Sequence, residues 1–210
     1  MKIESRVGIV AGVLLALVSI CATVEARAVN TPDVVGILPA VSVIGDGPAE
    51  TRAEAGWMAS YGRGATQWLS ADEVRRRMAI SDPSGALARA AREQIWRNGS
   101  VDAATAARLC KVLDVGAVLS LRVDRWETAE RRGMVAMTAS LSGADGPELW
   151  SASDAAGYGH RELPDVDAQE HPDHRTCAAY STLLARWAMQ LPAWVQEELV
   201  SSAIPSPPVE

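Results

Sequence analysis

Phenylalanine is absent from this 210-residue chain, and lysine occurs only at Lys2 and Lys111. Nearly all the basic charge is therefore arginine, and the formal net charge at pH 7 is −6. Nucleic-acid binders carry a basic stripe, and the only basic run here is residues 75–77, which we interpret as a solvated helix face paired with nearby acids. The composition thus argues against a nucleic acid as partner. A hydrophobic fraction of 48% excludes a wholly disordered chain.

The sequence also lacks the motifs that mark common catalytic sites. It has no Gly-x-Ser-x-Gly elbow, no phosphate-binding loop and no His-Glu-x-x-His helix. Neighbouring acids such as Asp72 and Glu73 are common, but on exposed segments they are usually solvated rather than catalytic. We therefore predict that the protein is not an enzyme and holds no cofactor.

The amino terminus has the three parts of a secretory signal peptide. Lys2 and Arg6 supply the charged start, and residues 7–20 form an uninterrupted apolar run. Ala26, Arg27 and Ala28 then make the small–x–small pattern of a cleavage site. We predict that residues 1–28 are a signal peptide and that the rest of the chain works in the periplasm.

Two alternatives for this leader stay open. The uncharged stretch over residues 7–24 is near the shortest length that spans a bilayer, so the leader could be an uncleaved anchor. Cys21 follows Val18, Ser19 and Ile20 as in a bacterial lipobox, although Ile20 is bulkier than the residue expected before a lipidated cysteine. Either alternative would anchor the protein to a membrane through its amino terminus, facing the periplasm.

Cleavage after Ala28 would leave two cysteines, Cys110 and Cys177. An even number of cysteines in an oxidising compartment permits a disulfide between them. Both fall on helix faces that the pattern predicts to be apolar, so two buried thiols fit the sequence equally well.

The remaining chain predicts a single α/β domain over residues 29–204, followed by a disordered, proline-rich tail over 205–210. Near-continuous apolar residues predict a buried strand over 34–39, and a short strand is expected over 66–69. Helices are predicted over 49–60, 70–78, 82–97 and 100–113, with Asp82 capping the third and Pro83 at its first position. A last long helix follows Asp173 and ends before Pro192, and a short amphipathic helix is expected over 193–203.

The clearest pattern lies over residues 116–156. Ala117, Leu119, Leu121 and Val123 alternate with their neighbours, which is the period of two of a strand with one buried face. A second alternating run covers 134–141, and a third strand is expected over 148–155 after a turn. We predict an antiparallel meander within a mixed sheet, with helices packed on it.

Three segments resemble a group of bacterial envelope proteins. They are the helix–glycine–strand junction over 106–119 (AARLCKVLDVGAVL), the hairpin start over 146–150 (GPELW) and the first strand over 35–39 (VGILP). The group is the α/β module of the Tol-system propeller protein's amino-terminal domain, of the curli secretion lipoprotein and of small lipoproteins. The resemblance covers roughly residues 34–190. It implies a non-enzymatic module that binds other envelope proteins, often with a lipid on a cysteine, here Cys21.

A metal site is the alternative interpretation. His171, His174 and Cys177 are spaced by three, His160 lies near them in sequence, and imidazole and thiolate groups suit zinc. The spacing matches no standard zinc pattern, so a solvated acidic loop that leads into a helix is preferred. The main hypothesis is therefore an exported envelope interaction or assembly module. Its alternative is a metal-binding or metal-dependent hydrolytic envelope protein that uses these four side chains.

The tryptophans divide into core and surface candidates. Trp126 and Trp150 lie on predicted strands and Trp187 on a helical stripe, which favours core packing. Trp194, in the short terminal helix, is the predicted exposed contact with a partner or a membrane.

Overall fold

The computed structural model describes residues 32–62, 66–129, 132–159 and 174–196, and they belong to the unit that begins at Pro32. Its elements are β1 (Val34–Ile37), β2 (Val41–Ser42), α2 (Gly47–Tyr61), β3 (Gln67–Leu69), α3 (Ala71–Ser81), α4 (Ala86–Asn98), α5 (Ala103–Leu113), β4 (Ala117–Ala129), β5 (Arg132–Gly143), β6 (Glu148–Gly159) and α6 (His174–Ala188). The predicted signal peptide, Cys21 and the 205–210 tail lie outside the described residues. Within the described ranges, no helix is both long enough and apolar enough to cross a membrane.

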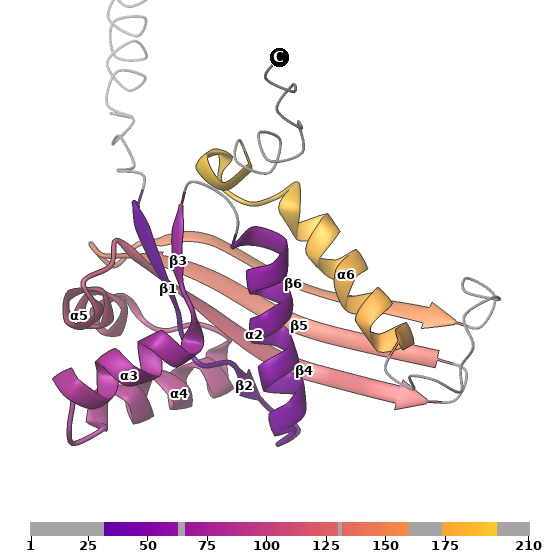
Figure 1. The fold of residues 1–210 in the computed structure, drawn as a ribbon, viewed down its shortest axis with the longest axis horizontal. Helices are drawn as coiled ribbons and strands as arrows, with labels where there is room; N and C mark the ends of the chain where they lie inside the picture. Colours follow the sequence, from indigo (N-terminus) through magenta and orange to yellow (C-terminus); the bar gives the residue numbers. More distant parts are fainter. Residues whose placement is uncertain (1–31, 63–65, 130–131, 160–173, 197–210) are drawn as a thin grey trace, which may run out of the picture. The chain divides into compact units, whose positions relative to one another are not determined.

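The strands form one mixed sheet in the order β3-β1-β4-β5-β6 (Figure 1). Strand β1 runs parallel to β3 and β4, whereas β4, β5 and β6 are antiparallel. Strand β2 takes over the pairing with β4 beyond the end of β1, with Val41 opposite Arg122. The predicted meander and the mixed α/β class are both confirmed. Strand β2 was not predicted, because it has two residues within a segment that carries turn residues.

The alternation along β4 divides the core into two clusters, one on each face of the sheet. Leu119 and Leu121 belong to the cluster that α2 and α6 cover, whereas Val118 belongs to the cluster of α3, α4 and α5. Figure 1 shows α2 and α6 lying across β4, β5 and β6. Successive side chains of a strand point to opposite faces, so one strand serves both cores.

Helix α4 begins at Ala86, later than the sequence predicts, so the expectation that Asp82 and Pro83 open this helix is wrong. Gly85 precedes it in the left-handed conformation, with φ 65°. The Asp82 carboxylate accepts the backbone N–H of Leu87 at 2.7 Å, so it caps the helix across an intervening turn. By contrast, Ser70 caps α3 as predicted.

Helices α2 and α6 are joined by two reciprocal hydrogen bonds. The Tyr61 hydroxyl on α2 donates to the Leu184 carbonyl at 2.6 Å, and the Tyr180 hydroxyl on α6 donates to the Ala53 carbonyl at 2.7 Å. Burial raises the pKa of both tyrosines, so both hydroxyls stay protonated donors. Gly56 lies between them, and a Cβ there would overlap the Tyr180 ring. The pair of helices therefore packs at a close and specific distance.

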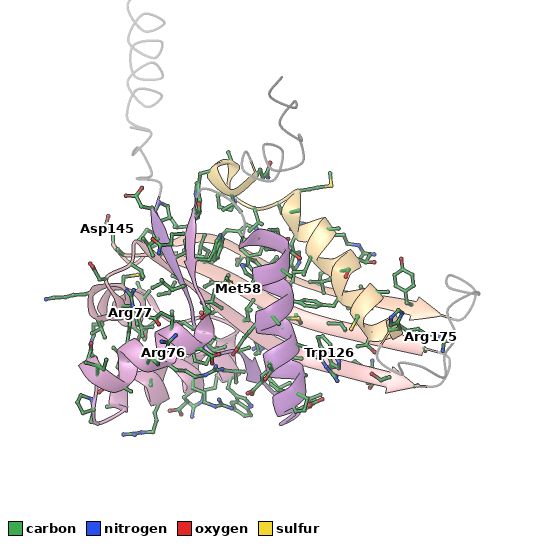
Figure 2. All side chains as sticks on the ribbon, in the orientation of Figure 1. Met58, Arg76, Arg77, Trp126, Asp145 and Arg175 are labelled. Carbon is green, nitrogen blue, oxygen red and sulfur yellow. The ribbon has the colours of Figure 1, made fainter. Side chains whose placement is uncertain are left out.

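The aromatic side chains between these helices and the sheet confirm part of the tryptophan prediction. Trp126 is 6%, Trp150 9% and Trp187 0% exposed, and Figure 2 labels Trp126 on β4. Trp57 of α2 contacts Trp150 and Trp187, with ring centroids 6.2 and 6.4 Å apart. Trp194 is half-buried and packs against this same core, so it is less exposed than the sequence predicts. Its contact with a partner or a membrane stays a prediction.

Candidate functional site

The predicted metal ligands do not come together among the residues that the structure describes. His174 and Cys177 are both exposed near the start of α6, and His160 and His171 lie outside the described ranges. Within those ranges no group of three or more His, Cys, Asp or Glu side chains is placed to hold a metal ion. No described geometry favours the metal interpretation.

Cys110 and Cys177 are both free thiols in the structure, so it does not show the disulfide that the cysteine count permits. Cys110 is buried in the cluster formed by α3, α4 and α5, whereas Cys177 is exposed on α6. The two helices cover opposite faces of the sheet, which separates the thiols. The expectation that Cys177 belongs to the apolar stripe of its helix is wrong. The buried stripe runs through its neighbours Thr176, Ala179, Tyr180, Leu183, Leu184 and Trp187.

A pocket of about 390 Å³ opens between α3 and α4, and we call it the α3–α4 pocket. Both helices line the pocket, and in Figure 1 both lie at the lower left of the view, with α4 behind α3. The floor combines side chains from both helices with side chains from α5 and from the chain that links β1 to β2. It consists of Leu38, Val74, Met78, Ala91, Ile95 and Leu109. Its volume lies within the range of small-molecule sites, about 300–1,000 Å³.

Two arginines at the mouth of this pocket are held by glutamates of α2. Arg75 donates to Glu54 at 2.7 Å, and Arg92 pairs with Glu50 at 3.2 Å. The same glutamate oxygens also accept backbone N–H groups. Glu54 accepts the N–H of Ala40 and Glu50 accepts the N–H of Ser42, each at 2.8 Å. The glutamates thus provide hydrogen-bond acceptors for backbone N–H groups in and just before β2, and they also hold the two arginines in position. Burial raises the pKa of Glu54, although the Ala40 N–H and Arg75 oppose this effect.

The mouth also has one arginine and one aspartate with different surroundings. Arg89 is exposed, donates to the Ser84 carbonyl at 2.9 Å and forms no ion pair within the described residues. Asp82 accepts the Ser84 hydroxyl and the N–H groups of Leu87 and Ala88, and these bonds lower its pKa. The aspartate is therefore occupied by α4, while the positive charge of Arg89 faces solvent.

The basic run on α3 behaves as the sequence predicts. Arg76 and Arg77, labelled in Figure 2, both pair with Glu73, at 2.9 and 3.0 Å. Arg75 pairs with Asp72 at 2.6 Å in addition to its contact at the pocket mouth. The run is a solvated helix face with local acidic partners, and only Arg75 reaches the pocket.

Three exposed apolar side chains lie on α4 and directly after β2, two elements that contact each other. Ile44 is 52% and Trp96 51% exposed, and Val43 is exposed beside Ile44. Trp96 lies one helical turn beyond Arg92 on α4. Arg92 pairs with Glu50, which also accepts the backbone N–H of Ser42 on β2. We call Val43, Ile44 and Trp96 the α4–β2 patch. Sequence reasoning missed Trp96, although the buried stripe of Leu87, Ala91 and Ile95 leaves position 96 off the core face.

The described lining of the α3–α4 pocket is mostly apolar, with arginines and one aspartate. No histidine, cysteine, serine, threonine or lysine lines the described α3–α4 pocket, and its one carboxylate, Asp82, is engaged as a helix cap. A catalytic acid or base needs a free side chain within reach of the reacting group. The lining offers apolar contact inside and guanidinium groups at the mouth.

No family model and no curated protein matches this sequence. Among solved structures, the chain is similar to lipoprotein GNA1162 from Neisseria meningitidis, with 16% identity and a TM-score of 0.47, over 74% of this chain and 98% of that one. It is also similar to the PelC dodecamer from Paraburkholderia phytofirmans, with 14% identity and a TM-score of 0.43, over 76% and 89% of the two chains. The LpoB C-terminal domain from Salmonella enterica shares 13% identity at a TM-score of 0.37, over 58% and 80%.

These similarities are distant ones of fold, to lipoproteins and envelope proteins of bacteria. All three TM-scores are below 0.5 and all three identities are below 25%.

Proposed function

We propose that this protein is an exported, non-catalytic component of the bacterial cell envelope that binds another envelope protein through the α4–β2 patch. The observation that carries the proposal is the exposure of two large apolar side chains, Trp96 on α4 at 51% and Ile44 just after β2 at 52%, on two elements that contact each other. Tryptophan is enriched among the residues that dominate protein–protein binding energy, and large apolar side chains clustered at a surface mark interaction sites.

Two features of the sequence and one of the structure support the location and the kind of activity. Residues 1–28 have the charged, apolar and small-residue parts of a secretory leader. Segments 106–119 and 146–150 resemble the envelope module of the Tol-system propeller protein and the curli secretion lipoprotein. The described pocket lining lacks a free catalytic group. Together they favour a module that docks to a neighbour in the periplasm.

The proposal holds whether the leader is cleaved or keeps the protein at a membrane. Cleavage after Ala28 gives a periplasmic protein, whereas lipid on Cys21 or retention of the apolar run keeps the domain at a membrane. In each case the α4–β2 patch lies on the exported domain. Binding at the patch is therefore tested independently of the anchor.

The test is photo-crosslinking in intact cells with a photoreactive amino acid at position 96. We expect one dominant adduct with a second envelope protein, and loss of that complex when Trp96→Glu is combined with a crosslinker at position 44. Position 189 is the matched control, because Met189 is 83% exposed at the end of α6, outside the patch. Equal adducts from positions 96 and 189, or no adduct at 96, would contradict the proposal.

A further inference from the structure

The interior of the α3–α4 pocket is apolar. Every side chain of its floor is apolar and at most 7% exposed, Met78 being the most exposed of them. The pocket still holds about 390 Å³ of open space. A partner helix would need wide, exposed apolar contacts, whereas the floor side chains are nearly buried. A pocket of this volume with so little exposed apolar floor favours a single hydrocarbon chain over a folded protein segment.

The mouth of the pocket adds a charge requirement. Arg75 and Arg92 are fixed there by Glu54 and Glu50, so their positions are set before a ligand arrives. Arg89 reaches the same mouth without a carboxylate partner among the described residues. A guanidinium group binds a carboxylate through charge-assisted hydrogen bonds, often two at once. An apolar interior with an unneutralised arginine at its entrance is complementary to a chain that ends in an anion.

We propose that the α3–α4 pocket binds a single acyl chain, with the hydrocarbon between α3 and α4 and the terminal carboxylate at Arg89. The aliphatic stems of the arginines extend the apolar wall at the entrance, so the first methylenes after the carboxylate remain covered. The positive end of α4 does not compete for the carboxylate, since Asp82 already accepts the N–H groups of Leu87 and Ala88.

The binding experiment uses the purified full chain and isothermal titration with straight-chain carboxylates below their micelle concentrations. We expect dodecanoate to bind at one site per chain. Affinity should rise about fourfold for each added methylene from octanoate upward, until the pocket is filled. Dodecyltrimethylammonium has a similar chain with a positive head, and we expect it to bind at least tenfold more weakly.

Two variants and one matched control locate the ligand. Arg89→Ala is expected to weaken dodecanoate binding about tenfold. Arg97→Ala should not, because Arg97 lies on the same helix, pairs with Glu93 and does not line the pocket. Ala91→Leu places extra methyl groups in the pocket, so it should reduce binding while circular dichroism shows a native fold.

Three results would overturn the proposal: no saturable dodecanoate binding, equal binding of the cationic amphiphile, or equal effects of Arg89→Ala and Arg97→Ala. If Ala91→Leu does not fold, Arg89→Ala still decides, because Arg89 is exposed and its loss leaves the core intact. Trp96→Glu should leave the dodecanoate affinity unchanged, since Trp96 is not in the pocket lining. Loss of partner binding at the patch and loss of acyl binding in the pocket are thus separate results.

Discussion

Replacing Gly56 by alanine tests the close packing of α2 against α6. A Cβ at position 56 would overlap Cε1 of the Tyr180 ring and lie 3.0 Å from its Cδ1. Rotating the Tyr180 side chain away would cost free energy, because its ring is buried and its hydroxyl donates to the Ala53 carbonyl at 2.7 Å. Either the two helices separate or the hydrogen bond is distorted. Both responses lower the free energy of unfolding.

The size of the effect follows from three contributions. Overpacking of a core costs about 1–3 kcal/mol, and distortion of a buried hydrogen bond adds about 1 kcal/mol. Alanine has a better helix propensity than glycine, and this offsets about 1 kcal/mol of the loss in stability. We therefore expect Gly56→Ala to lower the free energy of unfolding by about 1–3 kcal/mol.

Urea unfolding followed by circular dichroism measures this change. Ala59→Ser is the matched control, because Ala59 is exposed in the same helix and the added atom faces solvent. The control should change the free energy of unfolding by at most about 0.5 kcal/mol. If Gly56→Ala is as stable as Ala59→Ser, the described contact between α2 and Tyr180 is wrong.

Three further predictions concern single groups. Tyr61→Phe leaves the buried Leu184 carbonyl without its donor and should cost about 1–2 kcal/mol in urea unfolding; an unchanged midpoint would refute the bond. A maleimide should label Cys177 in the native protein and Cys110 only after unfolding, since burial raises the pKa of Cys110 to about 11, and peptide mass mapping showing equal rates would contradict this. Asp82 has a folded pKa below its unfolded value, so its stabilisation is complete above pH about 4 and is lost as pH falls through the folded pKa. Asp82→Asn should thus be less stable than the parent at pH 7 and converge with it in acid, and a constant difference would be evidence against the cap.

The meander could be predicted because its pattern is local. In β4 every second residue from Ala117 to Val123 is apolar and buried, so the period of two identifies the strand and the face that packs against α2 and α6. It does not reveal that the opposite face is also covered, by the helices on the other side of the sheet. The start of α4 could not be placed in the same way. Asp82 and Pro83 look like the opening of a helix, but the structure inserts a left-handed Gly85 and lets Asp82 cap from a distance.

The surface of α6 shows why a residue's neighbours in sequence can mislead. Cys177 is three residues before Tyr180, a spacing that suits one helix face, yet it is exposed while Thr176 is buried. The face that contacts the sheet is centred one residue away from the predicted one.

The α3–α4 pocket could not be predicted from a local pattern at all. Its floor brings Leu38 together with Met78, Ile95 and Leu109, which are far apart in the sequence and belong to separate elements. Each of these residues alone fits an ordinary core position. The pocket exists only because the two helices and the chain before β2 leave space between them, which is a property of the assembled fold.

The most direct test of the whole account is the mass and cellular location of the mature polypeptide. Fractionation followed by mass spectrometry of the intact protein should place it in the periplasm or with the envelope. The mass should show loss of residues 1–28, a lipid on Cys21, or retention of the leader in a membrane fraction. A full-length, unmodified product among the soluble cytoplasmic proteins would contradict the claim that this domain works by binding a partner in the envelope.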